Sequence, residues 1–100
     1  MSENWWKTAK GTFIDNSTDL QELLDNAGDK KLVVIDFFMQ NCHYCKKFKD
    51  DWNRIVDDFI AEYGPEQIQF VKVDGIADYF SAARFDIESY PSFIAIEPGS

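Results

Sequence analysis

The stretch LVVIDFFMQNCHYCKKF, residues 32–48, joins an apolar run to two cysteines and then to a charged helical pattern. Residues 32–39 are nearly continuous in β-branched and aromatic side chains, which is typical of a parallel strand covered on both faces and predicts a central position in a sheet. From residue 43 to about 62, apolar side chains recur every three or four positions, which predicts one long helix. Cys42 and Cys45 therefore lie between the central strand and the first turn of that helix.

The rest of the chain alternates between strand and helix patterns. The further predicted elements are strands at 10–14, 68–74 and 92–96 and helices at about 18–27 and 77–85. Thr18 and Gln21 fit a capping box at the start of the first helix, and Gly28 is placed to end it. The alternation predicts βαβ units and an α/β fold, in a single domain that covers residues 1–100.

Composition limits the kinds of partner that the chain can bind. The 100 residues include 10 basic and 18 acidic side chains, for a net charge of −8, which repels phosphate backbones and anionic lipids alike. No apolar run resembles a secretory signal or a membrane span. We therefore expect the chain to bind neither nucleic acid nor membranes. We also expect it to be a monomer. It would be cytoplasmic if the chain is complete, and would lie in the endoplasmic reticulum lumen or another secretory compartment if it is an excised domain.

The two cysteines are the only ones in the sequence, and their spacing indicates chemistry rather than architecture. A bridge between residues three apart constrains the unfolded chain very little. At Cys42, the unpaired N–H groups of the helix N-terminus would stabilise a thiolate. Cys45 lies one turn later on the same face, close enough to form a disulfide and further into the protein. This arrangement predicts a nucleophilic thiol and a resolving thiol, and hence redox chemistry.

A metal site is the main alternative use of such a pair. Zinc would need two further ligands, and the only histidine, His43, lies between the cysteines, where it is poorly placed to share a tetrahedron with both. We therefore expect neither a metal site within one chain nor any cofactor. A zinc or iron–sulfur site assembled from the cysteines of two chains remains an alternative function.

Asp36 interrupts the apolar run of the central strand. Burial of a carboxylate is costly and should raise its pKa toward neutrality, so that Asp36 could take up and return protons near Cys45. Lys72, on the strand predicted at 68–74, is the expected charge partner. The alternative is an Asp36 at the end of the strand that faces water.

Two residues between the cysteines are candidates for tuning the pair. His43 adds positive charge beside Cys42, which would stabilise the thiolate and make the disulfide a stronger oxidant. Tyr44 is the second candidate. A solvent-exposed His43 with only a modest influence is the alternative.

Together these residues resemble the thioredoxin superfamily over nearly the whole chain. The segments VVIDFF, NCHYC, FVKVD and YPSF carry the resemblance, in that order. It implies a three-layer α/β/α fold with a central mixed sheet, thiol–disulfide exchange with proteins that carry disulfides or dithiols, and a redox partner protein. By this resemblance Cys42 is the attacking thiol, Cys45 the resolving thiol and Asp36 the buried acid, with Lys72 near that acid.

The resemblance also implies a substrate-binding edge. Pro91 matches the cis-proline that faces the cysteines in this superfamily, and Tyr90 would offer its main chain to an extended substrate peptide. Phe38 and Asn41 complete the candidate substrate-binding set. Without the resemblance, a trans Pro91 that opens an edge strand would be the preferred interpretation.

Within the superfamily, the sequence most resembles a protein disulfide isomerase catalytic domain, although its CHYC motif is neither the CGPC of thioredoxin nor the CGHC of the isomerases. Asn41 stands where a tryptophan usually precedes the first cysteine. Members of the superfamily continue past the turn at residues 97–99 into one more strand and a C-terminal helix. Both would be missing if Ser100 is the true C-terminus, and we expect the sequence to be a fragment. A non-catalytic peptide-binding module with the same fold is the alternative function.

Overall fold

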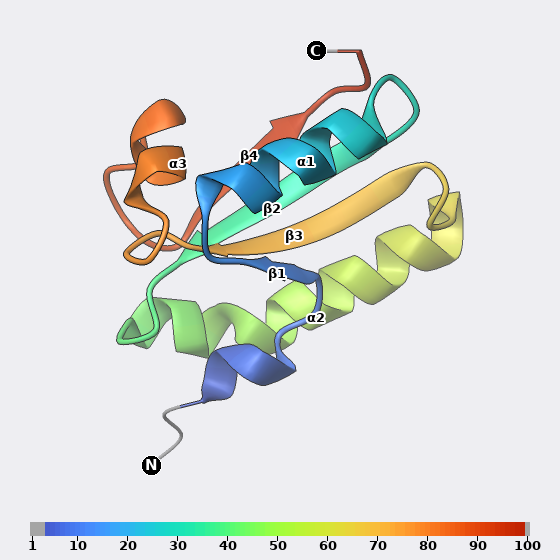
Figure 1. Ribbon diagram of the computed structural model, residues 1–100. Coiled ribbons are helices and arrows are strands. Elements are labelled where there is room, and N and C mark those ends of the chain that lie inside the picture. The colour runs from blue at the N-terminus through green and yellow to red at the C-terminus, as the bar shows by residue number, and fades with distance from the viewer. Residues whose placement is uncertain (1–3, 100) are drawn as a thin grey trace.

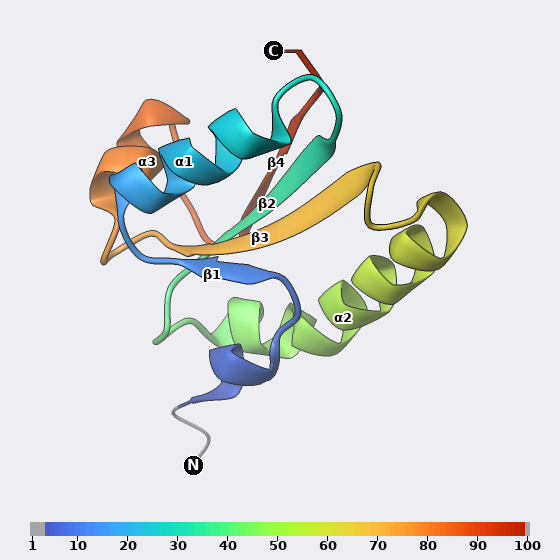
Figure 2. The same ribbon diagram turned by 45° about the vertical axis from the view of Figure 1, so that its right-hand side comes forward.

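A four-stranded β-sheet forms the middle layer of the computed structural model, which describes residues 4–99 (Figure 1). The elements in chain order are the 3-10 helix η1 (Trp5–Thr8), β1 (Thr12–Ile14), α1 (Ser17–Ala27), β2 (Leu32–Phe38), α2 (His43–Tyr63), β3 (Ile68–Asp74), α3 (Tyr79–Arg84) and β4 (Ser92–Ile96). Helix α2 lies on one side of the sheet, and α1 and α3 lie on the other (Figure 2). Residues 1 and 100, the predicted bounds of the domain, lie outside the described residues.

The strand order is β1-β3-β2-β4. β3 runs parallel to both of its neighbours, β1 and β2, whereas β4 runs antiparallel to β2. β2 is therefore central, as its apolar sequence predicts, and the sheet is mixed. The helices on both sides complete the predicted three-layer α/β/α fold, which is confirmed. Between residues 4 and 99, no strand or helix follows β4.

Side chains of β2 enter a different apolar cluster on each face of the sheet. Val33 and Phe37 belong to a cluster with residues of α1 and α3, whereas Val34 packs against a cluster that contains Trp52 of α2. Because successive side chains of a strand point to opposite faces, Asp36 lies on the same face as Val34. The acidic residue of the strand therefore faces the layer formed by α2, which also carries both cysteines at its start.

Helix α1 is capped by a residue other than the predicted one. Asn16 is the N-cap: its Oδ1 accepts a hydrogen bond from the backbone N–H of Asp19 at 2.8 Å, and its Nδ2 donates to the Asp19 carboxylate at 2.8 Å. The predicted capping box of Thr18 and Gln21 is therefore wrong, because asparagine is as good a cap as threonine and comes two residues earlier. The predicted end at Gly28 is confirmed, with φ at 55°.

Two predicted elements are shorter in the structure. The first strand starts after Gly11, whose backbone has a φ of 106° and passes so close to β3 that a Cβ atom would lie 3.1 Å from the carbonyl oxygen of Phe70. Helix α3 starts after Asp78, whose carboxylate accepts a hydrogen bond from the N–H of Ser81 at 3.1 Å. A close approach of two backbones fixes the first boundary and a side-chain cap fixes the second, whereas the pattern of apolar residues extends past both.

Candidate active site

The two cysteines occupy the start of α2. Cys42 is the N-cap residue, and its Sγ accepts the backbone N–H of Cys45 at 3.1 Å. The two sulfurs are joined as a disulfide, with the Cα atoms 5.3 Å apart. Cys45 is buried, whereas Cys42 is half-buried. The sulfur of Cys42 therefore lies where the N–H groups of the helix N-terminus favour negative charge, and it is the more accessible of the two, as predicted.

Asp36 is buried in β2, with 8% of its surface exposed, so the alternative of a water-facing carboxyl is wrong. Its Oδ1 has no hydrogen-bond partner among the described residues. Burial raises the pKa of Asp36 to about 7, and the positive charge of Lys72 opposes this rise. A carboxyl with this pKa exchanges its proton near neutral pH.

Lys72 is the direct neighbour of Asp36 across the β2–β3 pair, where their Cα atoms are partners in the register. Its ammonium donates to the backbone carbonyl of Trp6 at 2.8 Å and to that of Ala9. Burial lowers the pKa of Lys72, and the charge of Asp36 opposes this effect. Among residues 4–99, the ion pairs with an N–O distance within 4.0 Å do not include one between Lys72 and Asp36.

The segment before β4 lies against the cysteines. The Tyr90–Pro91 peptide bond is cis, as the resemblance predicts. The carbonyl oxygen of Tyr90 lies 3.8 Å from the Sγ of Cys42. The phenol ring of Tyr90 packs over Gly75, where any Cβ atom would overlap with the ring. Burial and the charge of Asp74 raise the pKa of the Tyr90 phenol.

The remaining predicted residues differ in their exposure. Asn41, His43 and Tyr44 are exposed beside the cysteines, and the rings of His43 and Tyr44 meet edge to face at 5.3 Å. Phe38, in contrast, is 2% exposed and packs edge-on against Trp5 with the ring centroids 5.7 Å apart. Its side chain forms part of the buried floor under the cysteines. The prediction that Phe38 contacts a substrate is therefore corrected, because N-terminal residues cover it.

Sequence reasoning missed the contribution of the N-terminal residues and of the loop before Cys42. The indole N–H of Trp5 donates to the carbonyl oxygen of Gln40 at 2.7 Å, and the Gln40 side-chain amide donates to Asp74 at 2.9 Å. Asp74 also accepts the backbone N–H groups of Ile76 and Ala77. The loop that carries the first cysteine is thus held from two sides. The adjacent tryptophans at 5 and 6 were the signal that could have indicated a buried N-terminal segment.

Comparison with known proteins shows the family to which the chain belongs. The Thioredoxin family model matches residues 12–100, a range that contains both cysteines, the buried carboxyl and the cis-proline. The chain belongs to the thioredoxin family. A thioredoxin from Oryctolagus cuniculus is 31% identical over 86 residues, which are 86% of this chain and 75% of that protein. The crystal structure of Schistosoma mansoni thioredoxin superposes with a TM-score of 0.74 at 32% identity, over 92% of this chain and 78% of that one.

The thioredoxin-family chain is also similar to part of a larger protein. Protein disulfide-isomerase A4 from Bos taurus is 26% identical over 96 residues, which are 96% of this chain. The chain spans only 14% of the length of that protein. The similarity therefore concerns one thioredoxin-like unit, and the activity of the whole isomerase does not transfer with it.

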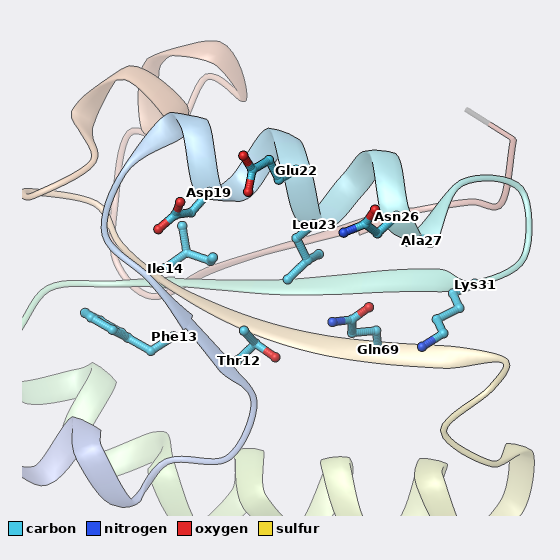
Figure 3. Close-up of a pocket in the computed structure, with 10 residues that line it drawn as sticks. All are labelled: Thr12, Phe13, Ile14, Asp19, Glu22, Leu23, Asn26, Ala27, Lys31 and Gln69. Atoms are coloured by element: carbon cyan, nitrogen blue, oxygen red, sulfur yellow. The ribbon is translucent and has the colours of Figure 1, made fainter.

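A separate groove of this thioredoxin-family chain lies away from the cysteines. It has a volume of about 540 Å³ and lies between α1 and the β1–β3 edge of the sheet (Figure 3). Carboxylates of Asp19 and Glu22 line its α1 side, and Lys31 and Gln69 line the opposite side. None of the predicted site residues contributes to this groove, and we assign it no function.

The part of the thioredoxin-family chain between residues 4 and 99 holds no group of three or more histidine, cysteine, aspartate or glutamate side chains that could bind a metal ion. In the same range, no helix combines the length and the apolar character needed to cross a lipid bilayer. The chemistry that the described residues do offer is that of two neighbouring sulfurs and a buried carboxyl.

Proposed function

We propose that this chain is a thiol–disulfide oxidoreductase that exchanges protein disulfides through Cys42 and Cys45. The observation that carries the proposal is the N-cap position of Cys42, whose half-buried sulfur accepts an N–H bond from α2 while it is joined to a buried second sulfur. Membership of the thioredoxin family supports the same reaction class. The substrates would be proteins with disulfides or dithiols, and a second redox protein would restore the starting state.

The reaction has two exchange steps. In the first, the Cys42 thiolate attacks one sulfur of a substrate disulfide, which forms a mixed disulfide and releases the other substrate sulfur as a thiolate that takes up a proton. In the second, Cys45 gives its proton to the Asp36 carboxylate and attacks the Cys42 sulfur. The second substrate sulfur leaves, and Cys42–Cys45 becomes a disulfide. Two electrons have then passed from the protein to the substrate, and the reverse sequence oxidises a dithiol.

Asp36 and Lys72 would serve the second step. Cys45 is buried, so solvent cannot readily take its proton, whereas Asp36 lies on the same face of β2 as Val34, which packs against α2. A pKa of about 7 makes Asp36 an effective proton acceptor and donor at neutral pH. The charge of Lys72 would act on Asp36 without pairing with it, because its ammonium is bonded to the carbonyl oxygens of Trp6 and Ala9 and leaves the carboxyl free. His43 and Tyr44, exposed beside Cys42, would tune the first step only modestly.

The substrate would bind as an extended segment along the Tyr90–Pro91 edge. The carbonyl oxygen of Tyr90 is close to the Cys42 sulfur, so main-chain bonds at residue 90 would align a substrate disulfide with the attacking atom. Asn41 is exposed on the same rim and would contact the flanking residues of the substrate. Such main-chain recognition would suit many different protein substrates.

Asp36→Asn is expected to slow the second step roughly 10²-fold at neutral pH, because asparagine cannot accept the Cys45 proton. The first step should change by less than a few-fold. Rapid-quench kinetics of insulin reduction would separate the two, with the exposed Asp58→Asn on α2 as a matched control. Equal slowing of both steps would refute the proton-transfer role of Asp36.

The redox potential of the cysteine pair would separate the possible directions of the reaction. A value near that of thioredoxin, about −270 mV, would indicate a reductase, whereas one near that of protein disulfide isomerase, about −180 mV, would indicate disulfide formation or reshuffling. Wild-type protein that fails to reduce insulin and shows no exchange with glutathione would refute the proposed function.

The cis-Pro91 segment beside the cysteines favours one second candidate, a non-catalytic peptide-binding module that holds a partner through this edge. This function predicts that client binding persists when both cysteines are replaced by serine. Metal analysis of anaerobically purified protein tests the remaining alternative, a site shared between two chains.

A further inference from the structure

The N-terminal segment Trp5–Lys10, here called the strap, is bonded to both the sheet and α2. From α2, the Trp52 indole donates to the carbonyl oxygen of Lys10 at 2.8 Å. Asn53 binds the strap twice: its amide donates to the carbonyl oxygen of Thr8 at 3.2 Å and its Oδ1 accepts from the N–H of Lys10 at 2.7 Å. Figure 2 shows the strap running beside the first half of α2 before the chain enters β1.

The sheet contributes a different kind of bond to the strap. Lys72, 5% exposed, directs its ammonium at two strap carbonyl oxygens, those of Trp6 and Ala9. These bonds use two of the three ammonium protons, and the third makes no ion pair with Asp36 within 4.0 Å among the described residues. The strap carbonyls therefore hold a buried positive charge that has a carboxyl, Asp36, as its cross-strand neighbour.

Asp36 does not pair with Lys72, although the two residues are register partners. Lys72 and Asp36 occupy register positions on neighbouring parallel strands, yet they form no ion pair within 4.0 Å among the described residues. The Oδ1 of Asp36 has no hydrogen-bond partner in the same part of the chain. The strap oxygens and the carboxyl thus compete for one ammonium group, and the strap holds it.

We propose that the strap is a positioning element that keeps the Lys72 ammonium away from the Asp36 carboxyl, so that this carboxyl stays free to exchange a proton with Cys45. The role in proton transfer rests on the proposed function. The competition between the strap carbonyls and Asp36 for the Lys72 ammonium is a property of the folded chain. Without the strap, Lys72 would turn to Asp36 and form a buried ion pair. A carboxylate held in that pair would accept the Cys45 proton poorly.

Lys72 is the charged group that shifts the pKa of Asp36. The register partners of Asp36 are Lys72 on β3 and Phe93 on β4. Two further titratable side chains, Cys45 of α2 and Tyr90 before β4, belong to one apolar cluster. The strap lysines face elsewhere, since Lys7 lies over the Trp6 ring and Lys10 pairs with Asp57. In the oxidised protein Cys45 is in the disulfide and does not titrate, which leaves Lys72 as the charge that the strap can move.

The test measures the protonation of Asp36 directly, by the pH dependence of its side-chain carboxyl ¹³C resonance in the oxidised protein. Asn53→Ala removes two strap bonds without touching the cysteines or Asp36, and a chain without residues 1–9 lacks both carbonyl groups that hold Lys72. In both variants the midpoint of the Asp36 titration is expected to fall as Lys72 reaches Asp36. The fall should be roughly 1 to 3 pH units in the shortened chain. Arg54→Ala, the next position on α2, is the matched control and should leave the midpoint unchanged.

Loss of the strap could also lower the Asp36 midpoint by letting water reach the carboxyl. Lys72→Met separates this effect from the proposed competition. In this background the midpoint should start higher than in the wild type, and removal of the strap should no longer lower it. An equal fall with and without Lys72, or an unchanged midpoint in both strap variants, would overturn the proposal. The titration needs no turnover, so it can be read even if the chain proves to have no oxidoreductase activity.

Discussion

Replacement of Cys45 by serine is expected to trap stable mixed disulfides between Cys42 and substrate proteins, whereas replacement of Cys42 is expected to abolish disulfide reduction. The difference follows from the two positions. Cys42 is the N-cap of α2 and the more accessible sulfur, so it starts the reaction, and Cys45 is buried behind it. Without Cys45, the mixed disulfide has no nearby thiol to resolve it.

Non-reducing electrophoresis after incubation with a disulfide-containing protein would show the trapped complexes as bands that dithiothreitol removes. Insulin reduction should fall to the uncatalysed rate in the Cys42→Ser protein. His43→Ala is a suitable control, because this exposed side chain should alter the rate only modestly. If Cys42→Ser traps substrates and Cys45→Ser does not, the two roles are reversed; if both variants turn over normally, the mechanism is wrong.

Replacement of Asp36 by asparagine is expected to stabilise the oxidised protein at about pH 8, by at most about 4 kcal/mol. Burial raises the pKa of Asp36 from 3.8 in the unfolded chain to about 7 in the fold. The folded state therefore binds the proton more tightly, and wild-type stability falls as pH rises from about 4 to 7. Asparagine is neutral throughout and avoids this loss.

Guanidinium unfolding of both proteins across this pH range would measure the effect. The difference in unfolding free energy should be small near pH 4, grow through the acidic range and level off above about pH 7. Asp58→Asn, on the exposed side of α2, should show no such trend. A difference between Asp36→Asn and wild type that does not depend on pH would contradict the raised pKa of the buried carboxyl.

The fold and the centre of the site could be predicted because local patterns determine them. The continuous apolar run of β2 and the helical spacing in α2 each identify one element, and their junction places Cys42 at a helix N-terminus. Asp36 was recognisable as a buried acid because the six other residues of β2 are all apolar. The cap of α1 was predicted incorrectly because three good capping residues, Asn16, Ser17 and Thr18, stand in a row.

The surroundings of the site could not be predicted, because contacts between distant parts of the chain produce them. The ammonium of Lys72 meets a carbonyl oxygen 66 positions earlier in the sequence. Likewise, the alternation of β2 shows which face Phe38 is on, but does not show that Trp5 covers it. Backbone carbonyls, moreover, have no signature in the amino-acid sequence, so their competition for a buried charge becomes visible only in three dimensions.

The packing of Tyr90 over Gly75 couples two positions that lie on different segments of the chain. Since even one methyl group at position 75 would overlap with the phenol ring, the two sites must vary together. A homologue with alanine or serine at the position of Gly75 should carry a smaller residue than tyrosine before its proline. Paired substitutions, tested against each single change, would then reshape the rim beside the cysteines without altering either sulfur.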